Sequence, residues 1–153
     1  MSESVTQAAS DLAQLVQELP AELAAIPEDL AAKKRADGGW SRKQVLGHLI
    51  DSATVNHQRF VRAQVETGFS LLYDGDRWVD LHGYQTAQWR ELITLWTALN
   101  RHILRVIERI PSEALGNLCG SGGENSWALS YRVNDYVHHL KQHLEQIRAF
   151  EKR

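Results

Sequence analysis

Near the end of the chain, the stretch DYVHHLKQHLEQI, Asp135 to Ile147, places three of the seven histidines within six residues. A helix turns by about 100° per residue, so side chains four positions apart share one face. His139 and His143 have this spacing and can direct two imidazoles at a single ion, as in helical zinc sites. His138 has no histidine four positions away and is predicted to face solvent. The pair predicts a metal site, with an ordinary polar helix flank as the alternative.

The position of this pair on its helix favours a site at the edge of the core. With Leu140 as the centre of the apolar stripe, His143 falls roughly 60° to one side and His139 roughly 100° to the same side. Asp135 and Gln146 lie on that flank too. They are candidates to accept the imidazole N–H that a metal does not use, which would fix the ring tautomer.

A third ligand must come from another helix, and His48 in VLGHLID is the best placed histidine. It lies roughly 100° from the centre of its own apolar stripe, again at the edge of the core. The adjacent Gly47 removes side-chain bulk and allows a neighbouring helix or a substrate to approach. His57 and His102 are interpreted as surface or packing residues. His82 could belong to a lid, but spacing gives it no partner.

Three neutral imidazoles on Zn²⁺ leave at least one position for water or substrate, which distinguishes a catalytic zinc site from a structural one. Cys119 lies in a glycine-rich segment and is not predicted to be a fourth ligand. A bound cation lowers the pKa of a water or thiol toward neutrality. Two reaction classes remain open: hydrolysis by an activated water, or transfer of a thiol to an electrophile. Three imidazoles accept most divalent first-row ions, so the metal is not specified.

Helical periodicity in four long segments, with no convincing alternating strand, predicts the elements that position these histidines. The first segment runs from Val5 to Ile26; Pro20 is expected to kink it, and Pro27 to open a further short turn. The second begins at WSRKQV, where Ser41 and Gln44 can form a capping box, and is expected to end at Gly68.

The third segment is predicted to run from near Thr86 to Pro111, and the fourth from near Ser126 or Ser130 to Ile147. None of the four helices can bury its stripe alone. The sequence therefore predicts an all-α fold, an antiparallel four-helix bundle, and a single domain spanning residues 1–153.

Two long connections separate the helices. Residues 68–85 are rich in aromatic side chains and are expected to pack over one end of the bundle. Within them, Arg77 could hold a carboxylate or phosphate of a substrate and Trp78 could line a pocket. The alternative is a loop held by surface ion pairs and aromatic anchors.

Residues 112–125 are polar and glycine-rich, and are interpreted as a flexible connector or a functional loop. Asp51 is interpreted as a solvated charge, and Trp127 as a core residue at a helical position.

Composition excludes several function classes. The formal net charge of −2 provides no broad basic surface for nucleic acid or an anionic membrane. No window approaches the roughly 20 apolar residues that span a bilayer. The N-terminal stretch lacks the features of a secretory signal. The single cysteine excludes an intramolecular disulfide and fits a reducing compartment, so a cytoplasmic location is expected.

Together, WSRKQVLGHLID and DYVHHLKQHLEQI resemble the DinB-like superfamily, also called YfiT-like metal-dependent hydrolases. The family pattern is a tryptophan–serine helix start, a histidine seven or eight residues later, and a later D-x3-H-x3-H helix. All of its positions are present here: Trp40, Ser41, His48, Asp135, His139 and His143. YDGDRW and LITLWTALNRHIL also look like the middle of family members, so the resemblance covers nearly the whole chain.

The resemblance implies an up-down-down-up bundle, commonly dimeric, with a divalent ion held by three histidines. Those ligands would be His48, His139 and His143, and Zn²⁺ or Ni²⁺ would be the expected ion. Relatives include bacillithiol and mycothiol transferases, so the resemblance favours a thiol-dependent S-transferase acting on a small electrophile. Its cofactor would be a bacillithiol-, mycothiol- or glutathione-type thiol. A metal-dependent hydrolase and a non-catalytic metal-binding bundle remain open alternatives. We expect a small-molecule substrate and a homodimer, with no nucleic-acid or membrane partner.

Overall fold

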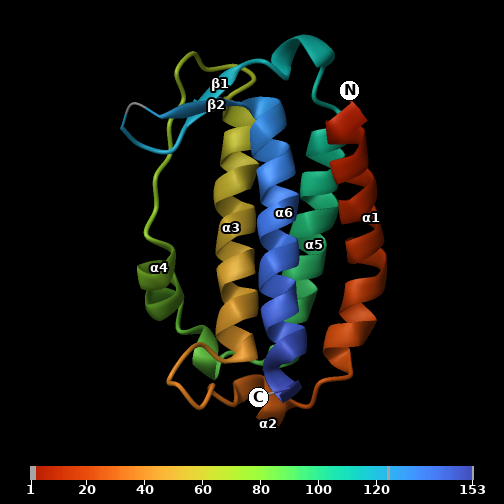
Figure 1. Cartoon of the computed structure of the whole chain (residues 1–153), viewed down its shortest axis with the longest axis vertical. Helices are drawn as coiled ribbons and strands as arrows, with labels where there is room; N and C mark the ends of the chain where they lie inside the picture. Colours follow the sequence, from red (N-terminus) through yellow and green to blue (C-terminus); the bar gives the residue numbers. More distant parts are fainter. Residues whose placement is uncertain (1–2, 124, 153) are drawn as a thin grey trace.

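Four long helices stand side by side in the computed structural model, which describes residues 3–123 and 125–152 (Figure 1). These helices are α1 (Glu3–Ala24), α3 (Arg42–Arg62), α5 (Trp89–Glu108) and α6 (Leu129–Arg148). Shorter elements join them: α2 (Glu28–Ala32), α4 (Gly75–His82), strands β1 (Leu118–Gly120) and β2 (Ser126–Ala128), and the 3₁₀ turns η1 (Tyr84–Thr86), η2 (Ser112–Ala114) and η3 (Ala149–Lys152).

The directions of the helices confirm the predicted up-down-down-up topology. In Figure 1, α1 and α6 run down the molecule, whereas α3 and α5 run up it. Helices α1 and α3 each pack against both α5 and α6. Because α3 and α5 are consecutive long helices that run parallel, the chain between them must travel back along the bundle. This return segment, residues 63–88, covers the outer side of α3 and brings α4 beside it.

The core forms where the predicted apolar stripes meet. Leu49 of α3, Trp96 and Ile103 of α5 and Leu140 of α6 are at most 1% exposed, as the helical periodicity indicates. Pro20 lies inside α1, and Pro27 precedes the short helix α2, as expected. Burial of these stripes in a shared core explains why each helix depends on its neighbours.

Helix α3 begins at the predicted capping box and ends earlier than predicted. The Ser41 side chain accepts a hydrogen bond from the Gln44 backbone, and the Gln44 side chain accepts one from the Ser41 backbone. The predicted end at Gly68 is wrong, because the helix stops at Arg62 and tight turns follow. Gly68 adopts a positive φ of 69° in the loop beyond those turns.

The expected position of residues 68–85 over one end of the bundle is also wrong, because this segment runs along the side of α3. At one end, Leu71 N donates to Gly120 O and Gly120 N donates to Phe69 O, which ties the segment to β1. Further along, the Asp74 side chain caps α4, and Gly83 ends it in the left-handed conformation. The segment is therefore a fixed outer layer over α3.

Residues 112–125, interpreted from sequence as a flexible connector or a functional loop, contain most of a small hairpin. Strands β1 and β2 pair antiparallel, with Leu118 opposite Ala128. Strands of three residues are too short for an alternating pattern to be visible in the sequence. Trp127 lies in β2, half-buried below the Arg132 guanidinium, so its interpretation as a helical core residue is wrong. Glu124 lies outside the described residues.

Across residues 3–123 and 125–152, no helix combines the length and apolar character needed to cross a membrane.

Candidate metal centre

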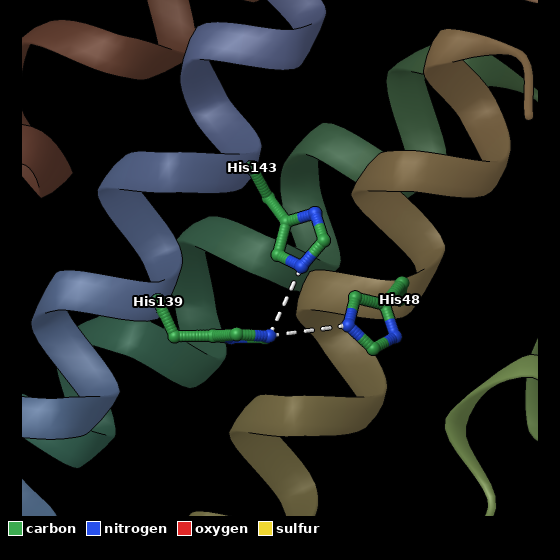
Figure 2. A group of neighbouring side chains, drawn as sticks. All are labelled: His48, His139 and His143. Carbon is green, nitrogen blue, oxygen red and sulfur yellow. Dashed lines mark hydrogen bonds between the residues drawn. The ribbon is translucent and has the colours of Figure 1, made fainter.

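Three histidine side chains from two antiparallel helices converge between α3 and α6 (Figure 2). Nε2 of His139 lies 3.4 Å from Nε2 of His48 and 3.0 Å from Nε2 of His143. With metal–nitrogen bonds of about 2.0–2.1 Å, a tetrahedral ion holds its ligand atoms roughly 3.3 Å apart. The spacing and the all-nitrogen donor set therefore fit one divalent ion. Metal ligation by this triad remains a prediction.

The three rings differ in their access to solvent. His48 is only 8% exposed, whereas His139 and His143 are half-buried. Trp40, at the start of α3, places its ring 5.2 Å from that of His48. The triad is therefore closed on the α3 side and more accessible on the α6 side, where a ligand could enter.

The environment keeps two of these imidazoles uncharged at neutral pH. The pKa of His48 is lowered to about 4, chiefly by burial and in smaller part by the neighbouring His143 and His139. Burial also lowers the pKa of His139 to about 4, with His143 contributing and Asp135 opposing. A histidine must be neutral to bind a metal ion. These rings are therefore ready to act as ligands at pH 7.

The two predicted supporting residues act in different ways. Nδ1 of His143 lies 2.9 Å from Oε1 of Gln146, and a carbonyl oxygen can only accept a hydrogen bond. This contact assigns the proton to Nδ1 and leaves the Nε2 lone pair facing the other two histidines. Asp135 is exposed one turn from His139 and acts on that ring through its charge. Roles for Gln146 and Asp135 beside a bound metal remain predictions.

Two glycines allow the outer layer to approach the site closely. A Cβ atom on Gly47 would lie 2.1 Å from Cδ2 of Tyr84, so the neighbour expected beside Gly47 is the Tyr84 ring. A Cβ atom on Gly75 would lie 3.0 Å from Cε1 and 3.3 Å from Nδ1 of His48. Helix α4 thus begins directly against the edge of His48 that faces away from the triad.

The two candidate substrate contacts, Arg77 and Trp78, both belong to α4. The Arg77 side chain is exposed, and its backbone N–H donates to the capping carboxylate of Asp74. Trp78 is half-buried, with its ring 5.0 Å from Tyr73 and 5.9 Å from His82. The structure brings the start of α4 to His48 but places neither side chain on the triad. Their contact with substrate remains a prediction.

Asp51 is the residue whose position the sequence did not indicate. It was expected to be solvated, but it is 1% exposed. Its Oδ1 atom accepts hydrogen bonds from the Tyr84 hydroxyl at 2.6 Å and from Nδ1 of His82 at 2.9 Å. Burial raises the pKa of the Asp51 carboxyl, and these two contacts offset part of the rise. The only available signal was the aromatic character of the return segment that covers it.

The remaining histidines lie apart from the triad. His57 of α3 and His102 of α5 contact each other with their rings tilted and the ring centroids 5.0 Å apart, in keeping with packing residues. His138 is exposed, as predicted. Cys119 is buried in β1.

A cavity of about 670 Å³ lies at the C-terminal end of α6. Gln146, which contacts His143, is part of its wall and so connects it to the triad. Its other lining residues come from the 30–42 region and from the end of the chain: Leu30, Lys33, Lys34, Arg35, Ala36, Asp37, Arg42, Gln142, Glu145, Ala149 and Phe150.

Comparisons with known proteins support the fold and give the family. No curated protein matches the chain significantly. Among solved structures, YfiT from Bacillus subtilis is similar over 100% of this chain and 89% of its own, with a TM-score of 0.83 and 22% sequence identity. That protein is described as a probable metal-dependent hydrolase with an unusual four-helix bundle topology. A family model for the DinB superfamily matches residues 5–147, and this chain therefore belongs to the DinB superfamily.

Proposed function

We propose that this chain is a divalent-metal-dependent enzyme that holds its ion on His48, His139 and His143. The observation that carries the proposal is the convergence of three Nε2 atoms from two helices, at separations that suit one ion. When bound, the ion supplies Lewis acidity, which lowers the pKa of a coordinated water or thiol toward neutrality. Zn²⁺ and Ni²⁺ are the ions we propose.

The protein residues would contribute position and charge. Three neutral imidazoles leave the full positive charge of a divalent ion uncompensated, which favours an anionic ligand such as a thiolate or hydroxide. Gln146 would hold His143 in the tautomer that presents Nε2. The accessible side of the triad, formed by His139 and His143, would admit the ligand.

Within this class, we propose thiol-dependent S-transfer to a small electrophile as the leading activity. The thiol would be of the bacillithiol, mycothiol or glutathione type. The cavity beside Gln146 has a volume in the range of small-molecule sites, roughly 300–1,000 Å³. Lys33 and Lys34 in its wall would favour a substrate or thiol that carries an anionic group. Arg77 and Trp78 remain proposed contacts from α4.

Hydrolysis of a small substrate is the second candidate. It is favoured by the likeness of the fold to YfiT, which is described as a probable metal-dependent hydrolase. The same triad would serve both reactions, since an open position can take either water or a thiol. A reaction assay therefore has to distinguish the two.

The first experiment measures metal content in protein purified without a histidine tag. We expect close to one ion per chain in the wild type and loss of the ion in His139→Ala/His143→Ala, because one ligand alone cannot hold it. His57→Ala/His102→Ala is the matched control, since it removes a neighbouring histidine pair elsewhere in the bundle. Absence of metal from wild-type protein, even after addition of Zn²⁺ or Ni²⁺ at neutral pH, would contradict the proposal.

The second experiment uses metal-loaded protein with a small electrophile, in the presence and absence of a low-molecular-weight thiol. Turnover that requires both metal and thiol supports S-transfer. Turnover that requires metal alone supports hydrolysis. Stoichiometric metal without either activity across a broad panel would favour a non-catalytic metal-binding bundle.

A further inference from the structure

Three buried side-chain polar atoms on α3 have no hydrogen-bond partner within the part of the chain that the structure describes: Nδ1 of His48, Oδ2 of Asp51 and Nε of Arg59. The first two concern the metal centre. His48 and Asp51 are three residues apart, so they stand one turn apart on neighbouring positions of the helix surface, with Cβ atoms about 5–6 Å apart. One atom belongs to an imidazole that can donate from Nδ1, and the other to a carboxylate that can accept. Their chemistry is complementary.

Both atoms lie beneath the same outer layer. The Nδ1 edge of His48 faces Gly75 at the start of α4. The Asp51 carboxylate contacts His82 at the end of α4 and Tyr84 just beyond it. The return segment therefore covers both groups on the side of α3 that faces away from the apolar core. A buried water makes two to four hydrogen bonds, so one water is able to pair with a donor and an acceptor at the same time.

The contacts of Asp51 fix which of its oxygens is available. The Tyr84 hydroxyl and Nδ1 of His82 both bond to Oδ1, from two different elements. Gly47 makes this arrangement possible, because any larger residue there would collide with the Tyr84 ring. The carboxylate is thus held in place, and Oδ2 is its remaining acceptor.

We propose that Asp51 is a positioning residue for His48: Nδ1–H of His48 donates to one buried water, and that water donates in turn to Oδ2 of Asp51. This link fixes the tautomer in which the Nε2 lone pair of His48 faces His139 and His143. Metal-binding histidines commonly donate their second ring N–H to a carboxylate, which orients the ring and increases its basicity. The link itself is a property of the metal-free protein, whereas its purpose rests on the proposed metal-dependent function.

The decisive experiment is ¹⁵N NMR of the His48 ring in metal-free protein at pH 7.5. We expect the Nδ1–H tautomer in the wild type and a shift toward Nε2–H in Asp51→Asn, because the asparagine N–H would donate to the bridging water, which is then able to donate to an unprotonated Nδ1. Asp80→Asn, an exposed change on α4, is the matched control and should leave the tautomer unchanged. The same tautomer in the wild type and in a folded Asp51→Asn variant would overturn the inference.

Metal affinity provides a second readout. We expect Asp51→Asn to weaken Zn²⁺ binding roughly 10–100-fold, the usual effect of losing such a partner. Tyr84→Phe keeps the ring on Gly47 and removes only the donor to Asp51 Oδ1. It should remain folded and show a smaller change in the same direction. If Asp51→Asn does not fold, the metal-free wild type decides: the Nδ1–H tautomer of His48 supports the inference, and the Nε2–H tautomer overturns it.

These readouts separate the inference from the proposed function. A tautomer shift in Asp51→Asn, together with no metal binding by the wild type, supports the link and contradicts the metal-dependent function. Metal binding by the wild type, with identical tautomer and affinity in Asp51→Asn, supports the function and overturns the link.

Discussion

At the scale of single residues, the triad combines close contact with low charge. Nε2 atoms lie 3.0 and 3.4 Å apart, a distance at which protonated rings would repel each other. Burial and this proximity hold the pKa of His48 and of His139 near 4, well below the ordinary histidine value of 6.5. Folding therefore favours the neutral form of both rings, and this preference has a measurable consequence.

We predict that the metal-free protein loses stability as the pH falls from about 6.5 to about 4. In this window, His48 and His139 bind protons in the unfolded chain but not in the folded one. Protons therefore favour unfolding, and the loss levels off below about pH 4, where both states are protonated. Urea denaturation at successive pH values, with metal removed, measures the effect.

The matched variant is His48→Gln/His139→Gln, which removes both titrating rings. It should show a shallower decline in the free energy of unfolding between the same pH limits. An equally steep decline would assign the acid sensitivity to other groups and contradict the prediction.

Residue-level inference from sequence succeeded where helical geometry alone determines position. His139 and His143 share a face because of their spacing, and His48 lies at the edge of its stripe for the same reason. Asp51 was misjudged because its burial comes from Tyr84 and His82, more than thirty residues away in the chain. Periodicity in one helix contains no information about a layer that a distant segment adds.

At the scale of elements, the contact between α3 and the return segment depends on Gly47, which has no side chain. The Tyr84 ring packs where the Cβ atom of any other residue at position 47 would lie, 2.1 Å from Cδ2. The ring is itself restrained by its bond to Asp51. Displacing it would disturb η1 and the outer face of α3 together.

We predict that Gly47→Ala destabilises the protein by about 1–3 kcal/mol, the usual cost of overpacking, despite the higher helix propensity of alanine. Gly116→Ala is the control, because a Cβ atom there meets nothing within 4 Å. Chemical denaturation of both variants tests the difference. Equal stability of Gly47→Ala and the wild type would show that Tyr84 can move at no cost.

The elements that could be predicted are those whose boundaries are marked by local sequence signals such as caps and prolines. The capping box at Ser41 and the position of Pro27 predicted two helix starts correctly, those of α3 and α2. The end of α3 and the hairpin β1–β2 were not predicted. Both depend on tertiary pairing: Phe69 and Leu71 bond to Gly120, and strands of three residues carry no periodic pattern.

At the scale of the whole molecule, the three histidines and the segment that covers them come from different parts of the topology. α3 and α6 supply the histidines, whereas the return segment between α3 and α5 supplies Gly75, His82 and Tyr84. The bundle was predictable because four apolar stripes of similar length have few ways to share a core. The order of helix directions was expected from family resemblance, since periodicity does not determine it.

We predict that the protein is a homodimer in solution, as the family resemblance implies. Multi-angle light scattering after size-exclusion chromatography, with and without Zn²⁺, measures the mass directly. A mass near 35 kDa, about twice the 17.4 kDa of one chain, is expected at all concentrations above the dissociation constant. A concentration-independent mass of one chain would contradict this prediction.

Because the first and last long helices, α1 and α6, run in the same direction, the topology also decides where a fusion partner can be attached. The chain enters at the end of the bundle that carries the hairpin and leaves at the other end, where Phe150 borders the cavity (Figure 1). A domain joined after η3 would emerge beside that cavity and compete with its occupants. One joined before α1 would be separated from it by roughly the length of α1, a 22-residue helix of about 33 Å. Affinity handles, fluorescent reporters and surface-immobilisation anchors therefore belong at the N-terminus.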